Sequence, residues 1–336
     1  MLTRMVKISD VAEEAGVSTA TVSRVLNGNP RVDPSLVQQV HEAADKLGYR
    51  LNALGRNLRQ QRTTVWVLIV SDIENPFFTS IARGVEDIAQ KNGFSVVLCN
   101  SDEDPVKEAK YLVVAEQEQA AGVILSPHSK STDVTGLKEA SIPLVTIDRL
   151  LDSSVDSVVV NSRGGARTAT SHLLEQGWKR PACVTGPSDA TTAMERAEGY
   201  ELALADRGLT DRSMVVNRQF RAEGGRAAVA ELLDAGHPPD SFFVANSNLA
   251  LGVLTELNIR GLQIGHDIGL VMFDDAPWAP FIDPPISVVA QPVYDIGSRA
   301  ARLLTERILE PHGAMCTSIV LETTLVVRGS SLRPLG

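Results

Sequence analysis

The stretch KISDVAEEAGVSTATVSRVLN, Lys7 to Asn27, predicts two short helices joined by a tight turn. Apolar residues recur at helical spacing before Gly16, and Ser9 is the expected cap of the first helix. Gly16 is expected to end that helix because glycine adopts the left-handed conformation without a Cβ penalty. Ser18 follows at a position from which its hydroxyl would cap the second helix.

The second helix is expected to turn its apolar residues inward and a slender, polar surface outward. Such a surface fits the major groove of DNA. A third helix is expected from Asp33, a good capping residue, through Pro34 to Gly48. On spacing alone, a purely structural three-helix bundle is the alternative to a DNA-binding helix-turn-helix.

The segment from Lys46 to Arg62 carries five lysine and arginine residues and no acidic residue. A basic run is usually a solvated face, but here it follows the helix-turn-helix candidate, and release of counterions from DNA phosphates would favour association. Residues 1–62 hold nine basic and six acidic side chains, net +3, whereas the other 23 basic and 35 acidic side chains give −12. The charge changes sign after Arg62, where we place a domain boundary.

The 336 residues, 43% of them hydrophobic, allow two or three domains with sizeable cores. Met1 to Met5 lacks the apolar core of a signal peptide, and no later run approaches the ~18 apolar residues of a membrane helix, so we expect a cytoplasmic protein. Cys99, Cys183 and Cys316 are odd in number and form no CxxC. They predict neither a disulfide framework nor a zinc site, and no cofactor is expected.

After Arg62, apolar runs of strand length alternate with helix-length stretches, which predicts a doubly wound α/β fold with parallel sheets. Such folds bind ligands at the carboxyl ends of the strands. Two glycine pairs, Gly84 with Gly93 and Gly199 with Gly208, share a nine-residue spacing that favours two similar lobes with a ligand-holding cleft between them. The expected strands are 65–70, 94–100, 122–127, 143–148, 157–160, 180–186, 213–216, 241–246 and 268–275.

The stretch DVAEEAGVSTATVSRVLNGNPRV, followed by LGYRLNALGRNLR, resembles the headpiece and hinge of the lactose-repressor (LacI/GalR) family of transcription regulators. In that family the second helix reads bases, and a hinge helix formed on DNA inserts a leucine into the minor groove. Leu58 stands at that place here, and a linker leucine packed on its own domain is the alternative. The resemblance implies a DNA-binding set of Ser18, Thr19, Ala20, Thr21, Ser23, Arg24, Asn27, Asn52, Leu58 and Arg59.

The resemblance continues through DIENPFF, NSDEDPVKEAKY, TIDR, ERAEGY, FDD, DPPISVV and QPV, which are similar to the family's sugar-binding-protein-like regulatory domain. It implies a periplasmic-binding-protein-like core, 63–336, in which lobe 1 spans about 63–161 and 293–322, and lobe 2 about 162–292 and 323–336. The implied effector-binding residues are Phe77, Phe78, Asp148, Arg149, Arg196, Phe220, Asn246, Asp274 and Gln291. Aromatic faces suit a sugar or a base, and an arginine donates several hydrogen bonds. For all of these except Arg196 and Asp274, a structural residue at a strand end is the alternative.

The sequence departs from the family pattern at two carboxylates. The family commonly has Asn-Asp where Asn246-Ser247 stands, and Val-Asp-Asn where Val160-Asn161-Ser162 stands. Carboxylates accept bidentate hydrogen bonds from sugar hydroxyls, so the resemblance assigns no particular sugar. Met272 also replaces a usual glycine, which is expected to narrow the local packing.

The sequence lacks GxGxxG after the first strand, GxxxxGK[ST], GxSxG and HExxH, and we expect no enzyme. A transport-type sugar-binding protein shares the core fold but would need a signal peptide and no headpiece. We expect a ligand-responsive regulator, a repressor that binds a near-palindromic double-stranded DNA operator as a homodimer. Its effector would be a carbohydrate or nucleoside-like small molecule, and no membrane is involved. The sequence leaves open whether the effector releases or strengthens DNA binding, and whether two dimers form a tetramer.

Overall fold

The computed structural model describes residues 6–26, 32–49, 63–310 and 315–334, which belong to two compact units, 1–62 and 63–336. Four of the expected DNA-binding residues, Asn27, Asn52, Leu58 and Arg59, lie outside the described residues. Within the described ranges, no helix has the length and apolarity needed to cross a bilayer.

The first unit contains three helices, α1 (Ile8–Glu14), α2 (Thr19–Leu26) and α3 (Pro34–Leu47). The three helices share a small apolar core. One fully buried valine from each helix belongs to it: Val11, Val22 and Val40. The Ser18 hydroxyl accepts a hydrogen bond from the Thr21 backbone N–H (3.1 Å), so the predicted cap of α2 is confirmed. The predicted turns are also confirmed, because the glycines that end α1 and α3 have φ of 61° and 64°.

The predicted cap of α1 at Ser9 is wrong. The helix begins at Ile8, with Lys7 at the N-cap, so Ser9 lies inside the first turn. The backbone N–H of Lys7 donates to the Asp10 carboxylate (2.9 Å). An acidic side chain in the first turn also complements the helix dipole. Asp10 therefore stabilises the N-terminus of α1, the role that was predicted for Ser9.

The second unit contains two six-stranded sheets, with strand orders β11-β5-β4-β3-β1-β2 and β12-β10-β9-β8-β6-β7. All neighbouring strands are parallel except the antiparallel pair β10 and β12. The strands are β1 (Val65–Val70), β2 (Ser95–Asn100), β3 (Gly122–Leu125), β4 (Leu144–Ile147), β5 (Asp156–Val160), β6 (Pro181–Thr185), β7 (Val215–Asn217), β8 (Ser241–Val244), β9 (Gly269–Phe273), β10 (Ser287–Ala290), β11 (Ser318–Leu321) and β12 (Thr324–Val326). All nine expected strands are present, and β10, β11 and β12 were not predicted.

Helices cover both faces of each sheet, as the doubly wound fold requires. They are α5 (Pro76–Lys91), α6 (Pro105–Gln117), α7 (Thr135–Glu139), α8 (Ser162–Glu175), α9 (Thr191–Ala205), α10 (Ala222–Leu233), α11 (Ser247–Ile259) and α12 (Val293–Leu309), with 3-10 turns at Thr210–Arg212, Ala279–Phe281 and Gly329–Ser331. Along β1, Trp66 and Leu68 belong to the apolar core that contains α5 and α12, whereas Val67 and Ile69 belong to the core that contains α6 and α7. Strands buried on both faces explain the continuous apolar runs of the sequence. Cys99 and Cys183 lie buried in β2 and β6.

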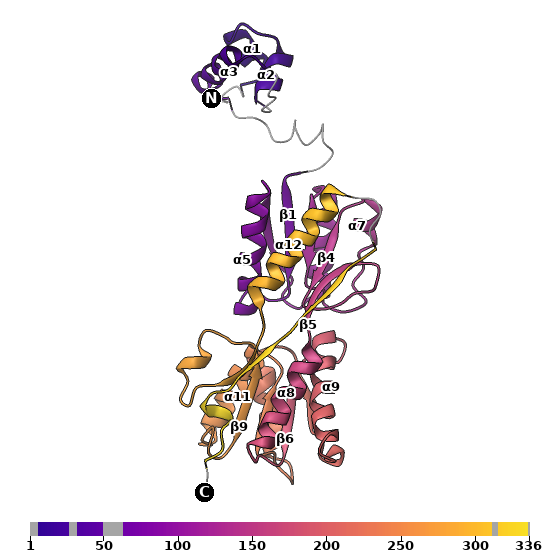
Figure 1. Ribbon diagram of the computed structural model, residues 1–336, viewed down its shortest axis with the longest axis vertical. Coiled ribbons are helices and arrows are strands. Elements are labelled where there is room, and N and C mark those ends of the chain that lie inside the picture. Colours follow the sequence, from indigo (N-terminus) through magenta and orange to yellow (C-terminus); the bar gives the residue numbers. More distant parts are fainter. Residues whose placement is uncertain (1–5, 27–31, 50–62, 311–314, 335–336) are drawn as a thin grey trace. The chain divides into compact units, whose positions relative to one another are not determined.

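The two sheets form two lobes of the second unit (Figure 1). Lobe 1 contains the first sheet with α5, α6, α7 and α12, and lobe 2 contains the second sheet with α8 to α11. The chain crosses between the lobes three times, between β5 and α8, between β10 and α12, and between β11 and β12. The carboxyl ends of the parallel strands of both sheets therefore meet the same crossing region.

The glycine repeat has a structural cause. A Cβ on Gly84 in α5 would lie 2.4 Å from the carbonyl oxygen of Tyr294 in α12, and one on Gly199 in α9 would lie 2.3 Å from that of Arg163 in α8. These glycines let each helix pair approach closely. The second glycine of each pair follows its helix with a positive φ, 76° and 66°.

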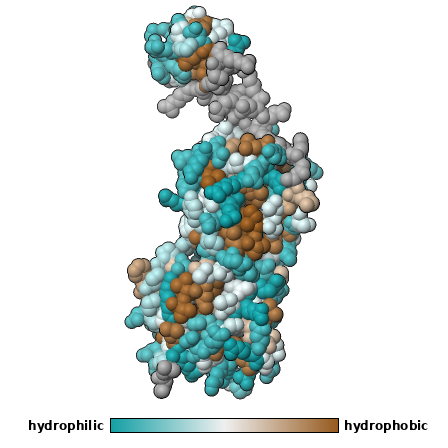
Figure 2. Space-filling view, in the orientation of Figure 1, coloured by the Kyte–Doolittle hydropathy of each residue, from teal (hydrophilic) through white to brown (hydrophobic). Residues whose placement is uncertain are grey.

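Apolar side chains are also exposed on the second unit, and Figure 2 shows them gathered in patches on both lobes. The exposed large apolar residues include Val97, Val106, Val113, Leu251 and Phe281, the last with 87% of its surface accessible. Contiguous exposed apolar patches mark interaction surfaces.

Gly84→Ala is expected to lower the free energy of unfolding by about 1–3 kcal/mol, because the added methyl group forces α5 away from α12. Gly236→Ala is the matched control, since no described heavy atom lies within 4 Å of its Cβ position. Chemical unfolding followed by circular dichroism measures both variants. Equal stability of the two variants would refute the close-packing role of Gly84.

Candidate functional site

The exposed face of α2 carries the expected base-reading residues. Ser18, Thr19, Ala20 and Arg24 are exposed, and Thr21 and Ser23 are half-buried. The Ser18 hydroxyl lies 2.9 Å from that of Thr21, so the cap and the surface share these two side chains. All six expected residues of the described part lie on or beside this one surface, away from the buried valines of the helix.

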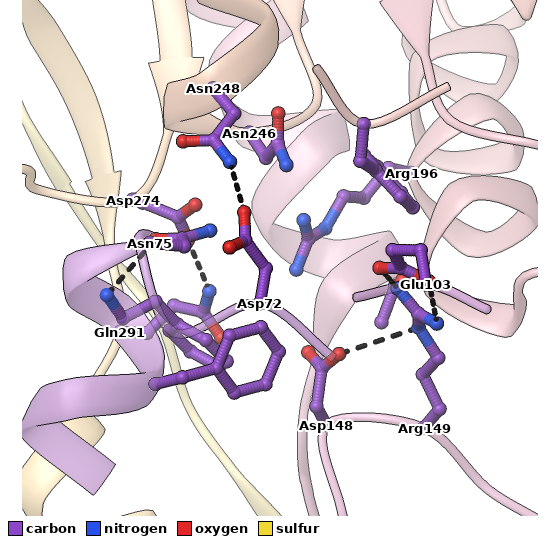
Figure 3. Close-up of a pocket in the computed structure, with 14 residues that line it drawn as sticks. Asp72, Asn75, Glu103, Asp148, Arg149, Arg196, Asn246, Asn248, Asp274 and Gln291 are labelled. Atoms are coloured by element: carbon purple, nitrogen blue, oxygen red, sulfur yellow. Dashed lines mark hydrogen bonds and ion pairs between the residues drawn. The ribbon is translucent and has the colours of Figure 1, made fainter. Parts of the chain in front are cut away.

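A pocket lies between the lobes, at the carboxyl ends of the strands (Figure 3). Every effector-binding residue expected from the resemblance lines it, and five further polar residues do so. The lining residues are Asp72, Asn75, Phe77, Phe78, Glu103, Asp148, Arg149, Thr192, Arg196, Phe220, Asn246, Asn248, Asp274 and Gln291. The two lobes thus build one site from segments far apart in the sequence.

Two aspartates enter the pocket from equivalent places in the two lobes. Asp148 follows β4 and Asp274 follows β9, and both adopt the left-handed conformation, with φ of 64° and 78°. Each backbone N–H donates to a carbonyl of the neighbouring strand, Val158 (3.3 Å) and Val289 (3.0 Å). Backbone strain of this kind costs about 1–3 kcal/mol per residue and is concentrated at functional sites. The strain here turns both carboxylates toward the cleft.

Burial changes the ionisation of both aspartates. Desolvation raises the pKa of Asp148 to about 6, although the nearby charges of Arg149 and Arg196 oppose the shift. Desolvation also raises the pKa of Asp274, against the charge of Arg196 and a 2.5 Å hydrogen bond from the Gln291 amide. Perturbed carboxyl groups in a cleft are typical of binding sites.

Arg196 is a buried cation of the pocket, with 3% of its surface accessible. Its Nη1 donates to the carbonyl oxygen of Ala245 (2.5 Å), and its guanidinium lies 3.8 Å from the ring centroid of Phe273. Its Nε has no hydrogen-bond partner among the described residues. Because an unsatisfied buried donor costs free energy, a ligand that accepts from Arg196 would be bound favourably.

Arg149 also has an Nε without a hydrogen-bond partner among the described residues, but its two terminal nitrogens are occupied. Its Nη1 and Nη2 donate to the two oxygens of Glu103, at 2.9 and 2.6 Å. Burial would raise the pKa of Glu103, but the charge and hydrogen bonds of Arg149, together with the nearby His128 side chain, outweigh it and lower that pKa to about 2. The pair forms one wall of the pocket in lobe 1.

Two asparagines combine helix capping with a place in the pocket. The Asn75 side-chain oxygen accepts from the Phe77 N–H (3.0 Å) at the start of α5, and that of Asn246 accepts from the Leu249 N–H (2.8 Å) at the start of α11. The oxygen of each amide is thus engaged, and its NH₂ group is left to donate toward the cleft. Helix starts from both lobes therefore present donors to a ligand.

Polar contacts also join the lobes at the pocket. The Asn248 amide donates to the Asp72 carboxylate (2.7 Å), and the Ser247 hydroxyl lies 3.5 Å from the Asn75 amide oxygen. Ser247 stands where the family commonly has a carboxylate. Asp72 and Glu103 supply carboxylates that the sequence analysis missed.

The missed lining residues are Asp72, Asn75, Glu103, Thr192 and Asn248. Asp72 and Asn75 lie within DIENPFF, and Glu103 lies within NSDEDPVKEAKY. A search for polar residues directly after β1 and β2 would have found Asp72 and Glu103, because such positions face the cleft in this fold.

Comparisons with known proteins define the class of protein. Residues 7–52 match the model of bacterial regulatory proteins of the lacI family, and residues 170–331 match the periplasmic binding protein-like domain. The chain belongs to the lacI family, as the resemblance predicted. It is a DNA-binding transcription regulator and not an enzyme.

Individual relatives are similar along nearly the whole chain. The ribose operon repressor of Halalkalibacterium halodurans is 35% identical over 324 residues, 96% of each chain. Catabolite control protein A of Priestia megaterium is 37% identical, over 90% of this chain and 92% of its own. Among solved structures, the transcriptional regulator CelR in complex with cellobiose is 32% identical, covers 97% of this chain and 99% of its own, and has a TM-score of 0.73.

Asp148→Asn is expected to stabilise the protein at neutral pH. The folded-state pKa of about 6 lies above the ordinary 3.8, so the folded state holds the proton more tightly, and the free energy of unfolding falls as pH rises from about 4 to 6. The variant removes a penalty of up to about 3 kcal/mol. Urea unfolding at pH 4 and 7.5 measures it. If the difference in free energy of unfolding between Asp148→Asn and wild type is the same at both pH values, it does not arise from ionisation of Asp148.

Proposed function

We propose that this protein is a repressor that binds a near-palindromic operator as a homodimer in the cytoplasm and responds to a neutral monosaccharide. D-ribose is the first candidate effector, and the pocket between the lobes is its binding site. The observation that carries the proposal is the buried Arg196, which lines the pocket beside two strained aspartates, Asp148 and Asp274, and whose Nε has no hydrogen-bond partner among the described residues. The relative named as a ribose operon repressor supports the choice of sugar.

The chemistry of the pocket suits a small polyol. Phe77 and Phe78 are packed edge to face, with 4.9 Å between their ring centroids, and Phe220 adds a third aromatic side chain. Aromatic faces pack against the C–H faces of a sugar, while its hydroxyls both donate and accept. Asp148 and Asp274 would accept from hydroxyls, and Arg196 would donate to them.

Gln291 offers a route from the pocket to the arrangement of the lobes. It lies on the crossing between β10 in lobe 2 and α12 in lobe 1, and its amide donates to Asp274. Its Oε1 has no partner among the described residues. A sugar that binds Asp274 would compete for this hydrogen bond and change the crossing. The effector would shift operator affinity only through different affinity for the two lobe arrangements, as inducer or as corepressor.

DNA recognition would use the exposed face of α2, with Arg24 as its basic residue. In the resemblance, Asn27 supports these contacts, while Asn52, Leu58 and Arg59 belong to a hinge that bends the operator. A change in lobe arrangement would alter the spacing of the two hinges in a dimer. Association of two dimers into a tetramer is not required by this scheme.

Arg196→Gln is expected to weaken d-ribose binding by at least about tenfold, because hydrogen bonds from a charged donor contribute about 1.5–3 kcal/mol. Isothermal titration calorimetry of the full-length protein measures the loss. Arg207→Gln, an exposed arginine just after α9, is the matched control and is expected to bind as wild type. Operator binding without sugar should stay intact in both. Undiminished binding by Arg196→Gln would remove this residue from the site.

Leu58→Ala is expected to reduce both operator bending and operator affinity, the latter by about tenfold or more, since a lost wedge forfeits the contacts of a bent duplex. The operator is first selected from a pool of randomised palindromic duplexes. Arg24→Ala is the comparison variant. It should lower the affinity for the operator, but the operator should be bent as in wild type in the complexes that still form. Gel mobility of circularly permuted fragments measures the bend. An unchanged bend in Leu58→Ala would exclude a wedge.

A further inference from the structure

Glu103 combines an unusual backbone with a buried ion pair. It follows Asp102, and both residues adopt the left-handed conformation, with φ of 58° and 55°. The Glu103 N–H donates to the carbonyl of Ser71 (2.9 Å), which holds the turn against the end of β1. Two successive strained non-glycine residues indicate that the position of this carboxylate matters.

Arg149 without Glu103 would be an anion receptor. Its guanidinium is buried and planar, and such groups bind carboxylates and phosphates in a bidentate manner. Beyond Glu103, its partners among the described residues are weaker. They are the carbonyl oxygens of Pro127 (3.3 Å) and His128 (3.2 Å), the Asp148 carboxylate at 3.5 Å, and the face of Phe220 at 5.5 Å. The two short bonds to Glu103 thus take the place that a ligand anion would occupy.

The net charge of the pocket also disfavours an anionic ligand. With Glu103 present, the lining contains four carboxylates and two guanidiniums, net −2 when all are ionised. An anionic ligand would meet this excess in a poorly solvated site, where like charges repel strongly. A neutral polyol would meet no such cost.

We propose that Glu103 is a specificity-determining residue: its carboxylate occupies Arg149 and makes the effector pocket reject anionic ligands such as sugar phosphates and sugar acids. This inference rests on the proposed function, in which the same pocket binds the effector. Glu103 itself need not touch the sugar. Glu103 acts by occupying the guanidinium of Arg149. Loss of the Glu103 charge should therefore alter the selectivity between neutral and anionic ligands more than it alters the affinity for the neutral ligand.

The first test compares d-ribose with d-ribose 5-phosphate on full-length protein by calorimetry. Wild type should prefer d-ribose, and Glu103→Gln should shift the ratio of the two affinities toward the phosphate by at least about tenfold. Asp102→Asn is the matched control, because it removes the same charge from the adjacent left-handed residue, whose partner Arg221 is exposed. The control should keep the wild-type ratio. A Glu103→Gln ratio within about twofold of wild type would overturn the proposal.

A second test needs no sugar and remains decisive if the pocket binds another effector. Glu103→Gly keeps the left-handed backbone and leaves a space shaped like a propionate ion beside Arg149. Propionate should raise the melting temperature of this variant, whereas propionamide should not, and neither should affect Asp102→Gly or wild type. No gain from propionate would also overturn the proposal. Absence of any d-ribose binding by wild type would instead refute d-ribose as effector, and the propionate result would still decide the role of Glu103.

Discussion

The buried guanidinium of Arg196 is the constraint on which the site depends. A cation with 3% of its surface accessible needs nearby negative charge, and the two lobes supply it through Asp148 and Asp274. Both carboxylates are themselves desolvated, and both stand on strained backbone. These buried charges and strained residues therefore lower the stability of the protein without ligand. A sugar that forms hydrogen bonds with them would restore part of that stability. Binding sites commonly lose stability in this way.

The two lobes repeat one arrangement, and the repetition brings their polar groups together. In each lobe an aspartate follows a central strand, and an asparagine caps a helix at the pocket, Asn75 in lobe 1 and Asn246 in lobe 2. Gly84 and Gly199 let the helices behind these residues pack closely within each lobe. Gln291, on the crossing between β10 and α12, donates to Asp274, and in the proposed function this hydrogen bond would couple the pocket to the lobe arrangement.

The apolar runs predicted β1 to β9, most of which are parallel strands buried on both faces. The three strands that were missed have three or four residues each: β10 is buried, and β11 and β12 are half-exposed. Ser9 was predicted to cap α1, but the helix begins at Ile8, one residue before Ser9, and the Asp10 carboxylate accepts from the Lys7 backbone N–H. The nine expected effector residues came from the family resemblance, and the structure brings them into one pocket; their contacts with a ligand are still a proposal. The pair of Arg149 with Glu103 joins residues far apart in sequence, so spacing alone could not predict it.

The most direct test of the account is reciprocal linkage between sugar and operator. Operator affinity is measured by fluorescence anisotropy with and without saturating d-ribose, and d-ribose affinity is measured by calorimetry with and without operator. The account predicts that each ligand changes the affinity of the other by the same factor. Binding of d-ribose in the pocket with no change in operator affinity would contradict it.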